Sequence, residues 1–206
     1  MILQTLKIYL KKYLFKDRDF YIPDYIRQMR VFFLAEIYEL IKEKDGAIVE
    51  CGVGHGNSLA VFGMLSKNEG KDRKVFGFDT FSGFPYFDDS ADKNKRYEFK
   101  DVSLQKVKDR VGPRPVLIKG TFEETLPHFE EGISLLFIDA DLYQSYMTVL
   151  NNLYEKVVPG GIIAFDDYGV ESWPGATRAV EEFFKDKNTK LIKSRYSKRH
   201  HYLVKP

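Results

Sequence analysis

The 206-residue chain has a single cysteine, a single tryptophan and no long apolar run. Cys51 has no partner for an intramolecular disulfide, which excludes a disulfide-stapled fold and is typical of a reducing compartment. No stretch of about eighteen apolar residues occurs, so stable membrane insertion is not expected. The sequence therefore predicts a cytoplasmic protein that is held together by its hydrophobic core.

The chain also lacks an excess of either charge. Thirty-two Lys and Arg residues oppose 30 Asp and Glu residues, which leaves a formal net charge of +2. Domains that bind nucleic acid usually carry a basic excess, so we expect no nucleic-acid partner and favour a small molecule. Apolar residues, in contrast, are plentiful at 44%, which is enough for one sizeable core.

The N-terminal stretch MILQTLKIYLKKYLFKDRDF has apolar residues at helical spacing, with lysines between them. It does not resemble a signal peptide, because the lysines interrupt every apolar stretch and no small-residue cleavage site follows. We expect helices within residues 1–44 that pack on the domain or on a second subunit. A membrane-surface helix, or a lid over a ligand site, is the alternative.

From residue 45 onward, β-rich runs alternate with helical patterns. The β-rich runs cover residues 47–51, 74–79, 115–120, 133–139 and 161–167. The helical patterns cover residues 102–110, 142–158 and 176–185. Strands that alternate with helices form parallel sheets with right-handed crossovers. The sequence predicts an α/β fold with a doubly wound, mostly parallel seven-stranded sheet over residues 45–206, which ends in an antiparallel hairpin.

The stretch VECGVGHGNS is a strand-to-helix turn at which an open parallel sheet binds its ligand. Gly52, Gly54 and Gly56 follow G-x-G-x-G spacing, which differs from the G-x-G-x-x-G spacing of dinucleotide-binding proteins. Glu50, before the glycines, suits an ammonium group, and Asp79, at the end of the second strand, suits the hydroxyls of a ribose. Together these features indicate S-adenosylmethionine, whereas a tight turn without a ligand is the alternative.

Pairs of aspartates follow two strands of the expected sheet. Asp139 and Asp141 lie in FIDADLY, and Asp166 and Asp167 lie in AFDDYG. Neighbouring strands are about 5 Å apart, so these carboxylates should converge at one edge of the sheet. Mg²⁺ accepts two or three carboxylates and would relieve their repulsion. Solvated turns or helix caps are the alternative interpretation of each pair.

Several longer segments resemble class I S-adenosylmethionine-dependent methyltransferases, and specifically the macrocin O-methyltransferase family, whose members modify sugars of macrolide and aminocoumarin antibiotics. The resemblance covers about residues 45–185 and rests on these segments in order: VECGVGHGNS, FGFDTFSGFP, GTFEETLP, FIDADLYQSYMTVLNNLYEKVVPGGIIAFDDYG and PGATRAVEEF. It implies a Rossmann-like methyltransferase domain over residues 45–206 and N-terminal helices over residues 1–44 that act as a lid or dimer contact. A homodimer is expected on the same ground.

The resemblance also implies roles for individual residues. Those expected to bind the cofactor are Glu50, Gly52, Gly54, Gly56, Ser58, Asp79, Thr80, Thr121, Phe122, Glu123 and Asp139. Those expected to bind Mg²⁺ are Asp139, Asp166 and Asp167. The chain departs from the related catechol-type enzymes at Leu142, near which they have a lysine, so a lysine base is excluded here.

Methyl transfer needs an aligned and deprotonated acceptor, and a metal ion that binds two adjacent oxygens favours a diol. We assign Asp139 as metal ligand and Asp141 as candidate base, although Asp139 could also take the proton and Asp141 equally fits an N-cap of the next helix. The first hypothesis is a Mg²⁺-dependent O-methyltransferase that acts on a sugar or glycosylated metabolite. The alternatives are a metal-independent N- or carboxyl-methyltransferase and a non-catalytic cofactor-binding protein.

Aromatic and histidine side chains have weaker assignments. Phe81, Phe84, Tyr86, Tyr143 and Trp173 suit either an acceptor pocket or core packing. His55 could touch a ligand or face solvent. His200 and His201 alternate faces of the last strand, so at most one points inward, and neither is assigned a role.

Overall fold

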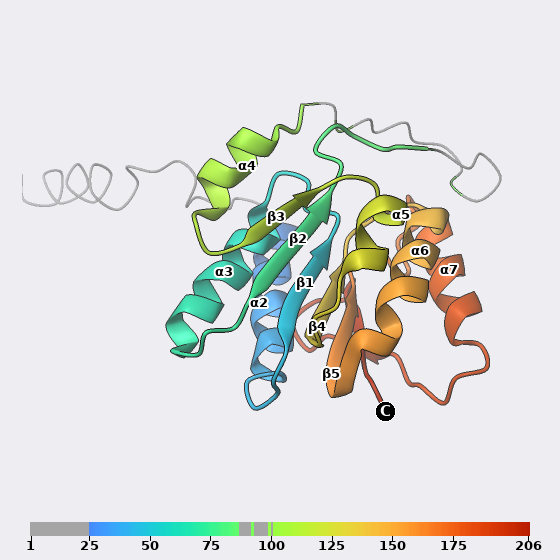
Figure 1. The fold of residues 1–206 in the computed structure, drawn as a ribbon. Coiled ribbons are helices and arrows are strands. Elements are labelled where there is room, and N and C mark those ends of the chain that lie inside the picture. Colours follow the sequence, from blue (N-terminus) through green and yellow to red (C-terminus); the bar gives the residue numbers. More distant parts are fainter. Residues whose placement is uncertain (1–24, 87–91, 93–98, 100) are drawn as a thin grey trace, which may run out of the picture.

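The computed structural model describes residues 25–86, 92, 99 and 101–206 of the chain. These residues form a seven-stranded sheet in the order β3-β2-β1-β4-β5-β7-β6, with helices on both faces (Figure 1). The strands are β1 (Ala47–Cys51), β2 (Val75–Asp79), β3 (Val116–Lys119), β4 (Ile133–Ile138), β5 (Val157–Phe165), β6 (Ile192–Lys193) and β7 (His201–Val204). Strands β1 to β5 are parallel, and β7 is antiparallel to both β5 and β6. The predicted doubly wound sheet and its C-terminal antiparallel hairpin are confirmed.

Helices cover the sheet in two layers. They are α2 (Tyr25–Glu39), α3 (Asn57–Glu69), α4 (Leu104–Val111), α5 (Phe122–Thr125), α6 (Tyr143–Leu153) and α7 (Pro174–Phe184). Short 3₁₀ turns follow α5 at Leu126–His128 and α6 at Tyr154–Lys156. Figure 1 shows α2 and α3 on one side of the sheet and α6 and α7 on the other. The predicted N-terminal helix before residue 24 lies outside the described residues.

The central strand β4, with the sequence ISLLFI, shows why the core has two halves. All six of its residues are buried. Leu135 and Phe137 pack with residues of α2 and α3, whereas Leu136 and Ile138 pack with α6 and α7. Successive side chains of a strand point to opposite faces, so a parallel strand covered on both sides needs a continuous apolar run.

Two predicted boundaries differ from the observed ones. The helix expected over residues 142–158 ends at Leu153, and β5 begins at Val157 instead of residue 161. Val157 pairs with Ile133, and an irregularity in the ladder absorbs the residues before Ile162 pairs with Leu135. The glycines there allow this bulge, because Gly160 has a φ of +74°. None of the helices in the described ranges has the length and hydropathy that a membrane crossing requires.

Candidate active site

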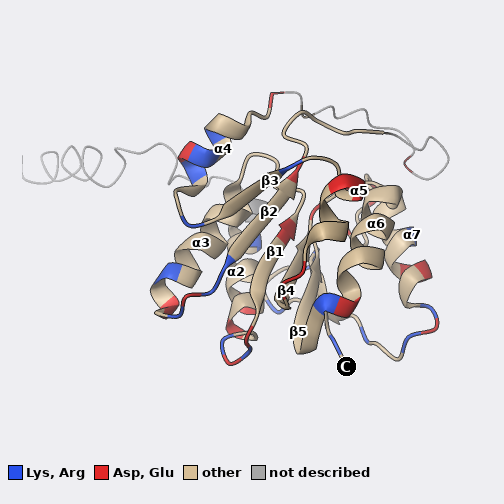
Figure 2. Ribbon diagram, in the orientation of Figure 1, with Lys and Arg blue, Asp and Glu red and all other residues tan. Residues whose placement is uncertain are grey.

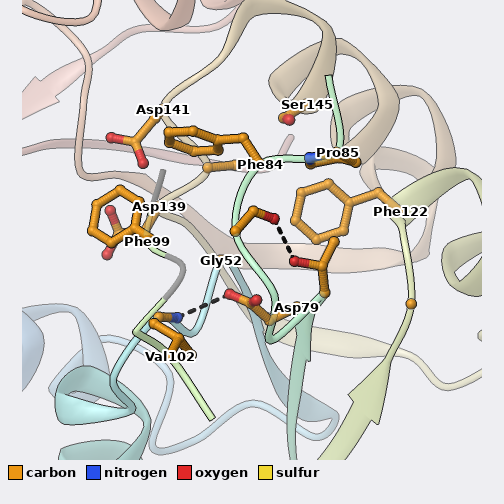
Figure 3. A pocket seen from close by; sticks show the side chains of 15 residues that line it. Gly52, Asp79, Phe84, Pro85, Phe99, Val102, Phe122, Asp139, Asp141 and Ser145 are labelled. Atoms are coloured by element: carbon orange, nitrogen blue, oxygen red, sulfur yellow. Dashed lines mark hydrogen bonds between the residues drawn. The ribbon is translucent and has the colours of Figure 1, made fainter. Parts of the chain in front are cut away.

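A pocket opens at the carboxyl edge of the sheet, between β1 and β4, where the strand order reverses. Open parallel sheets bind ligands at this position. Its volume is about 690 Å³ when the part open to solvent is included. Figure 3 shows the side chains that line it. Its walls comprise Gly52, Gly54, Asp79, Thr80, Gly83, Phe84, Pro85, Phe99, Val102, Gly120, Phe122, Asp139, Ala140, Asp141 and Ser145. Its lining therefore combines predicted cofactor residues with both predicted catalytic aspartates, Asp139 and Asp141.

The three glycines of the bend after β1 serve different purposes. A Cβ on Gly52 would lie 1.9 Å from the carbonyl oxygen of Asp139, so this glycine lets β1 approach the loop after β4. A Cβ on Gly56 would meet α4 side chains at 2.9 and 3.0 Å. A Cβ on Gly54 would have no described atom within 4 Å, and its φ is +51°. Gly54 is thus the one whose small size leaves room for a ligand.

Glu50 lies in β1 and is completely buried. Its Oε1 accepts a hydrogen bond from the Ser58 hydroxyl, but its Oε2 is buried with no hydrogen-bond partner among the described residues. Burial raises the pKa of the Glu50 carboxyl well above its usual value. A buried oxygen without a partner is costly, so this position suits a ligand that donates hydrogen bonds or carries positive charge.

Asp79 ends β2 and is held by backbone donors. Its two oxygens accept hydrogen bonds from the Gly54 amide at 2.9 Å, drawn dashed in Figure 3, and from the Phe81 amide at 2.6 Å. Burial raises the pKa of Asp79. The adjacent Thr80 hydroxyl donates to the Gly83 carbonyl at 2.6 Å, which fixes the turn. Each carboxylate oxygen has a second lone pair that a ligand hydroxyl can use.

The turn before α5 closes another side of the pocket. Thr121 caps α5 with a capping box, and Phe122 lines the pocket. The Glu123 carboxylate accepts hydrogen bonds from the hydroxyls of Tyr86 at 3.1 Å and Thr148 at 2.9 Å. Glu123 is therefore tied to neighbouring protein groups, whereas Phe122 offers an apolar surface to a planar ring.

Three of the predicted aspartates lie together beside the pocket. Asp139, Asp166 and Asp167 each offer an oxygen atom, and these atoms lie within 4.8 Å of one another. Asp141 also lines the pocket, with a strained φ of +59°, and its amide donates to Asp167 Oδ2 at 3.1 Å. The alternative role of Asp141 as a helix N-cap is wrong, because Leu142 holds the N-cap position of α6.

Cationic side chains that the sequence did not assign to the site contact the same carboxylates. Arg30 of α2 donates to Asp139 and, at 3.2 Å, to Asp166. His200 Nε2 lies 3.0 Å from Asp166 Oδ1, and the other ring nitrogen lies 2.6 Å from the Ser197 hydroxyl. His200 is buried, so of the two histidines it is the one that points inward.

Arg199 completes this cationic side of the cluster. Its Nη2 lies 3.5 Å from Asp166 Oδ2 and 4.0 Å from Asp167 Oδ1. Helical spacing could have indicated that Arg30 points toward the sheet, because it shares a helix face with Phe33, Leu34 and Ile37, which are buried. Arg199 and His200 lie in the hairpin turn, where sequence pattern gives little indication of direction.

The pKa values of the aspartates reflect burial and mutual repulsion. Burial raises the pKa of Asp139 to about 6 despite the opposing charge of Arg30. Burial also raises the pKa of Asp167, and repulsion by Asp139 and Asp166 adds to it. At Asp166, burial is outweighed by Arg30, His200 and Arg199, which lower its pKa. Burial and mutual repulsion thus favour the protonated forms of Asp139 and Asp167, whereas the cations favour the ionised form of Asp166.

Aromatic side chains divide between pocket and core. Phe84 and Phe99 line the pocket, and their rings meet edge to face with centroids 5.4 Å apart. Trp173 packs behind them against Phe84, at 6.0 Å, and belongs to the core. The Tyr143 hydroxyl donates to Glu182 on α7. His55 is largely exposed, 3.5 Å from Asp101.

The sequence model of the macrocin-O-methyltransferase (TylF) family matches residues 24–194, which is most of the chain and all of the pocket. The chain belongs to this family. The family match begins before the predicted domain start at residue 45 and takes in the described helix α2.

Members of the family and proteins of the same fold are similar over most of the domain. Demethyldecarbamoylnovobiocin O-methyltransferase of Streptomyces niveus is 31% identical over 67% of this chain and 58% of its own length. Mycinamicin III 3''-O-methyltransferase of Micromonospora griseorubida is 30% identical over 67% of this chain and 60% of its own. The chain thus spans about 60% of the length of these relatives.

Solved structures show the same architecture. The calicheamicin methyltransferase CalS11 superposes with a TM-score of 0.78 at 25% identity, and the O-methyltransferase NovP with a TM-score of 0.73 at 26% identity. Each comparison covers 86% of this chain and 79% of the other. The Rossmann-like methyltransferase fold predicted from the sequence is confirmed.

Proposed function

We propose that this TylF-family protein is an S-adenosylmethionine-dependent, Mg²⁺-dependent O-methyltransferase that acts on a hydroxyl of a sugar or glycosylated small molecule. The observation that carries the proposal is the pocket at the β1–β4 crevice, whose walls include Asp79 and Asp139. Glu50 is buried in β1, and Asp166 and Asp167 lie beside Asp139. Among the relatives, one is named for methylation of a rhamnosyl-bearing tetracenomycin. This supports a sugar hydroxyl as acceptor.

The cofactor side of the pocket fits an adenosylated amino acid. Glu50 Oε2, buried and without a partner, would receive the ammonium group of the methionine part. Ser58 would keep Glu50 in place, the backbone from Gly52 to Gly56 would adjoin the same part, and Asp79 with Thr80 would take the ribose hydroxyls. Phe122, between Thr121 and Glu123, would contact the adenine.

The aspartate cluster fits a hard divalent ion, because its oxygens converge and its negative charge exceeds that of the nearby arginines. Asp139, Asp166 and Asp167 would hold Mg²⁺, which supplies a lower pKa for an acceptor hydroxyl and orients two adjacent oxygens. Asp141, in the pocket wall, would accept the acceptor's proton; its burial raises the carboxyl's pKa. Phe84 and Phe99 would keep water from the transferred methyl group.

One observation favours the metal-independent alternative. Arg30 already places a positive charge between Asp139 and Asp166. A guanidinium there could hold an acceptor or balance the carboxylates without an ion. In that case methyl transfer to nitrogen or carboxylate would need no deprotonating metal, and chelators would have no effect.

The direct test is methyl transfer from radiolabelled S-adenosylmethionine to a panel of nucleotide sugars and glycosides, with Mg²⁺ and with EDTA. We expect transfer to a hydroxyl that EDTA abolishes and Mg²⁺ restores. The doubly substituted Asp166→Asn, Asp167→Asn variant should lose transfer while it retains cofactor binding by calorimetry. Transfer that persists in EDTA would support the metal-independent enzyme, and a chain that does not bind the cofactor would contradict the proposal.

A further inference from the structure

Arg30 occupies an unusual position for a charged residue of a helix that packs on the sheet. Its guanidinium bridges Asp139 Oδ2 and Asp166 Oδ2, two of the three carboxylates whose oxygens converge. It also lies 5.7 Å from the centroid of the Phe137 ring in β4. Its side chain is 30% exposed. Arg30 is therefore partly exposed, and its guanidinium lies over a buried ring of the core.

The other cations of the cluster are placed differently. His200 is buried behind Asp166 and is fixed by Ser197. Arg199 approaches Asp166 and Asp167 at 3.5 and 4.0 Å, which is too far for strong hydrogen bonds. Arg30 is the cation whose guanidinium nitrogens donate to both Asp139 and Asp166, where an ion bound by both would lie.

We propose that Arg30 is the resident counter-charge of the cation site and that a divalent ion must displace it to bind. This rests on the proposed Mg²⁺ dependence. A compact ion with two charges approaches carboxylate oxygens at about 2.1 Å, closer than a guanidinium can. An ion held by Asp139 and Asp166 would need the space between these carboxylates that the Arg30 guanidinium occupies.

Helix α2 is built so that Arg30 can leave without loss of the helix. Glu36, six residues further along, is buried and accepts hydrogen bonds from the Ser194 hydroxyl at 2.6 Å and from the Arg195 amide at 3.2 Å. This anchors the C-terminal half of α2 to the segment after β6. Displacement of Arg30 would therefore release only the N-terminal half, which couples occupancy of the ion site to the start of α2.

The test measures Mn²⁺ affinity by the loss of the free-ion electron paramagnetic resonance signal, in the full chain without acceptor. We expect Arg30→Met, which keeps an aliphatic side chain beside Phe137, to bind Mn²⁺ roughly tenfold more tightly than the wild type, equivalent to about 1.4 kcal/mol. Arg30→Lys, which keeps the charge but cannot bridge two carboxylates, should lie between them. The control is Lys42→Gln, which removes an equal charge near the other end of α2, where Lys42 pairs with exposed Glu39.

Amide hydrogen exchange gives a second readout. Mn²⁺ should speed exchange in the first half of α2 in the wild type and leave it unchanged in Arg30→Met. Equal or weaker Mn²⁺ affinity in Arg30→Met, with Mn²⁺ bound by the wild type, would overturn the role of Arg30 and leave the proposed metal dependence intact. If neither wild type nor variant binds Mn²⁺, both the displacement and the Mg²⁺ dependence are contradicted.

Discussion

Glu50 is the residue at which stability and ligand binding are most clearly opposed. Its Oε2 has no partner in a buried setting, while Oε1 is held by Ser58. Glu50→Gln keeps the shape and the Ser58 contact but removes the charge that an ammonium group needs. We expect S-adenosylmethionine affinity, measured by calorimetry, to fall by at least about tenfold, because a buried charge-assisted hydrogen bond is worth roughly 1.5–3 kcal/mol.

The same Glu50→Gln variant should unfold at an equal or higher temperature than the wild type when no cofactor is present, because it no longer buries a carboxyl that lacks a partner. Ser58→Ala is the matched comparison, since it removes the supporting hydroxyl and leaves the charge. Unchanged cofactor affinity in Glu50→Gln would show that this carboxyl does not bind the ammonium group.

Glu69 gives a pH-dependent contribution to stability that lies far from the pocket. Hydrogen bonds from Arg73, with a further one from the Tyr38 hydroxyl, lower the pKa of Glu69 to about 2. The folded pKa lies below the unfolded value of about 4.3, so the stabilisation is complete above that value and is lost as pH falls toward 2.

The free energy of unfolding of Glu69→Gln should therefore be about 1–3 kcal/mol below that of the wild type near neutral pH, and this difference should shrink between pH 4.5 and 2. Urea unfolding at several pH values measures it. Glu131→Gln, which removes the exposed partner of Lys74, should change stability by less than about 1 kcal/mol. A difference between Glu69→Gln and wild type that does not vary with pH would contradict the assignment.

At the scale of secondary-structure elements, the close approach of β1 to the loop after β4 positions the pocket. Gly52→Ala would place a Cβ 1.9 Å from the Asp139 carbonyl oxygen. It should lower the free energy of unfolding by more than about 3 kcal/mol, because the backbone of β1 or of the loop after β4 must move. Gly54→Ala meets no described atom and should cost only about 1–2 kcal/mol for its positive φ.

The two glycine variants separate packing from binding when thermal unfolding and cofactor calorimetry are measured together. Gly54→Ala should stay folded and bind the cofactor more weakly, because its methyl group projects into the pocket. Equal loss of stability in both variants would mean that the bend acts only as a structural turn.

The sequence predicted these elements to different extents. The apolar run of β4 and the alternation of strands with helices follow from burial on both sheet faces, so the parallel sheet and the convergence of Asp139 with Asp166 could be anticipated. The start of β5 could not, because the bulge at Gly160 depends on pairing with β4 and β7. Arg30 was missed for a similar reason, since its contacts join residues more than 100 positions apart.

At the scale of the whole molecule, charge is spread rather than concentrated. Figure 2 shows basic segments on α3 and α4 and acidic ones on β1 and α5, interspersed over the described part of the chain. The acidic residues Asp139, Asp166 and Asp167 at the carboxyl edge are therefore a local cluster in a molecule of mixed charge. The relatives extend beyond the length that this chain matches, so the acceptor and any partner subunit are proposals to be tested on the protein itself.

The most direct measurement is anomalous diffraction from crystals grown with S-adenosylhomocysteine and Mn²⁺. The predicted result is a manganese peak bound by Asp139, Asp166 and Asp167, with Arg30 moved away from it and the amino group of the cofactor product at Glu50. A manganese peak elsewhere, or a cofactor product bound outside the β1–β4 crevice, would contradict the proposed site.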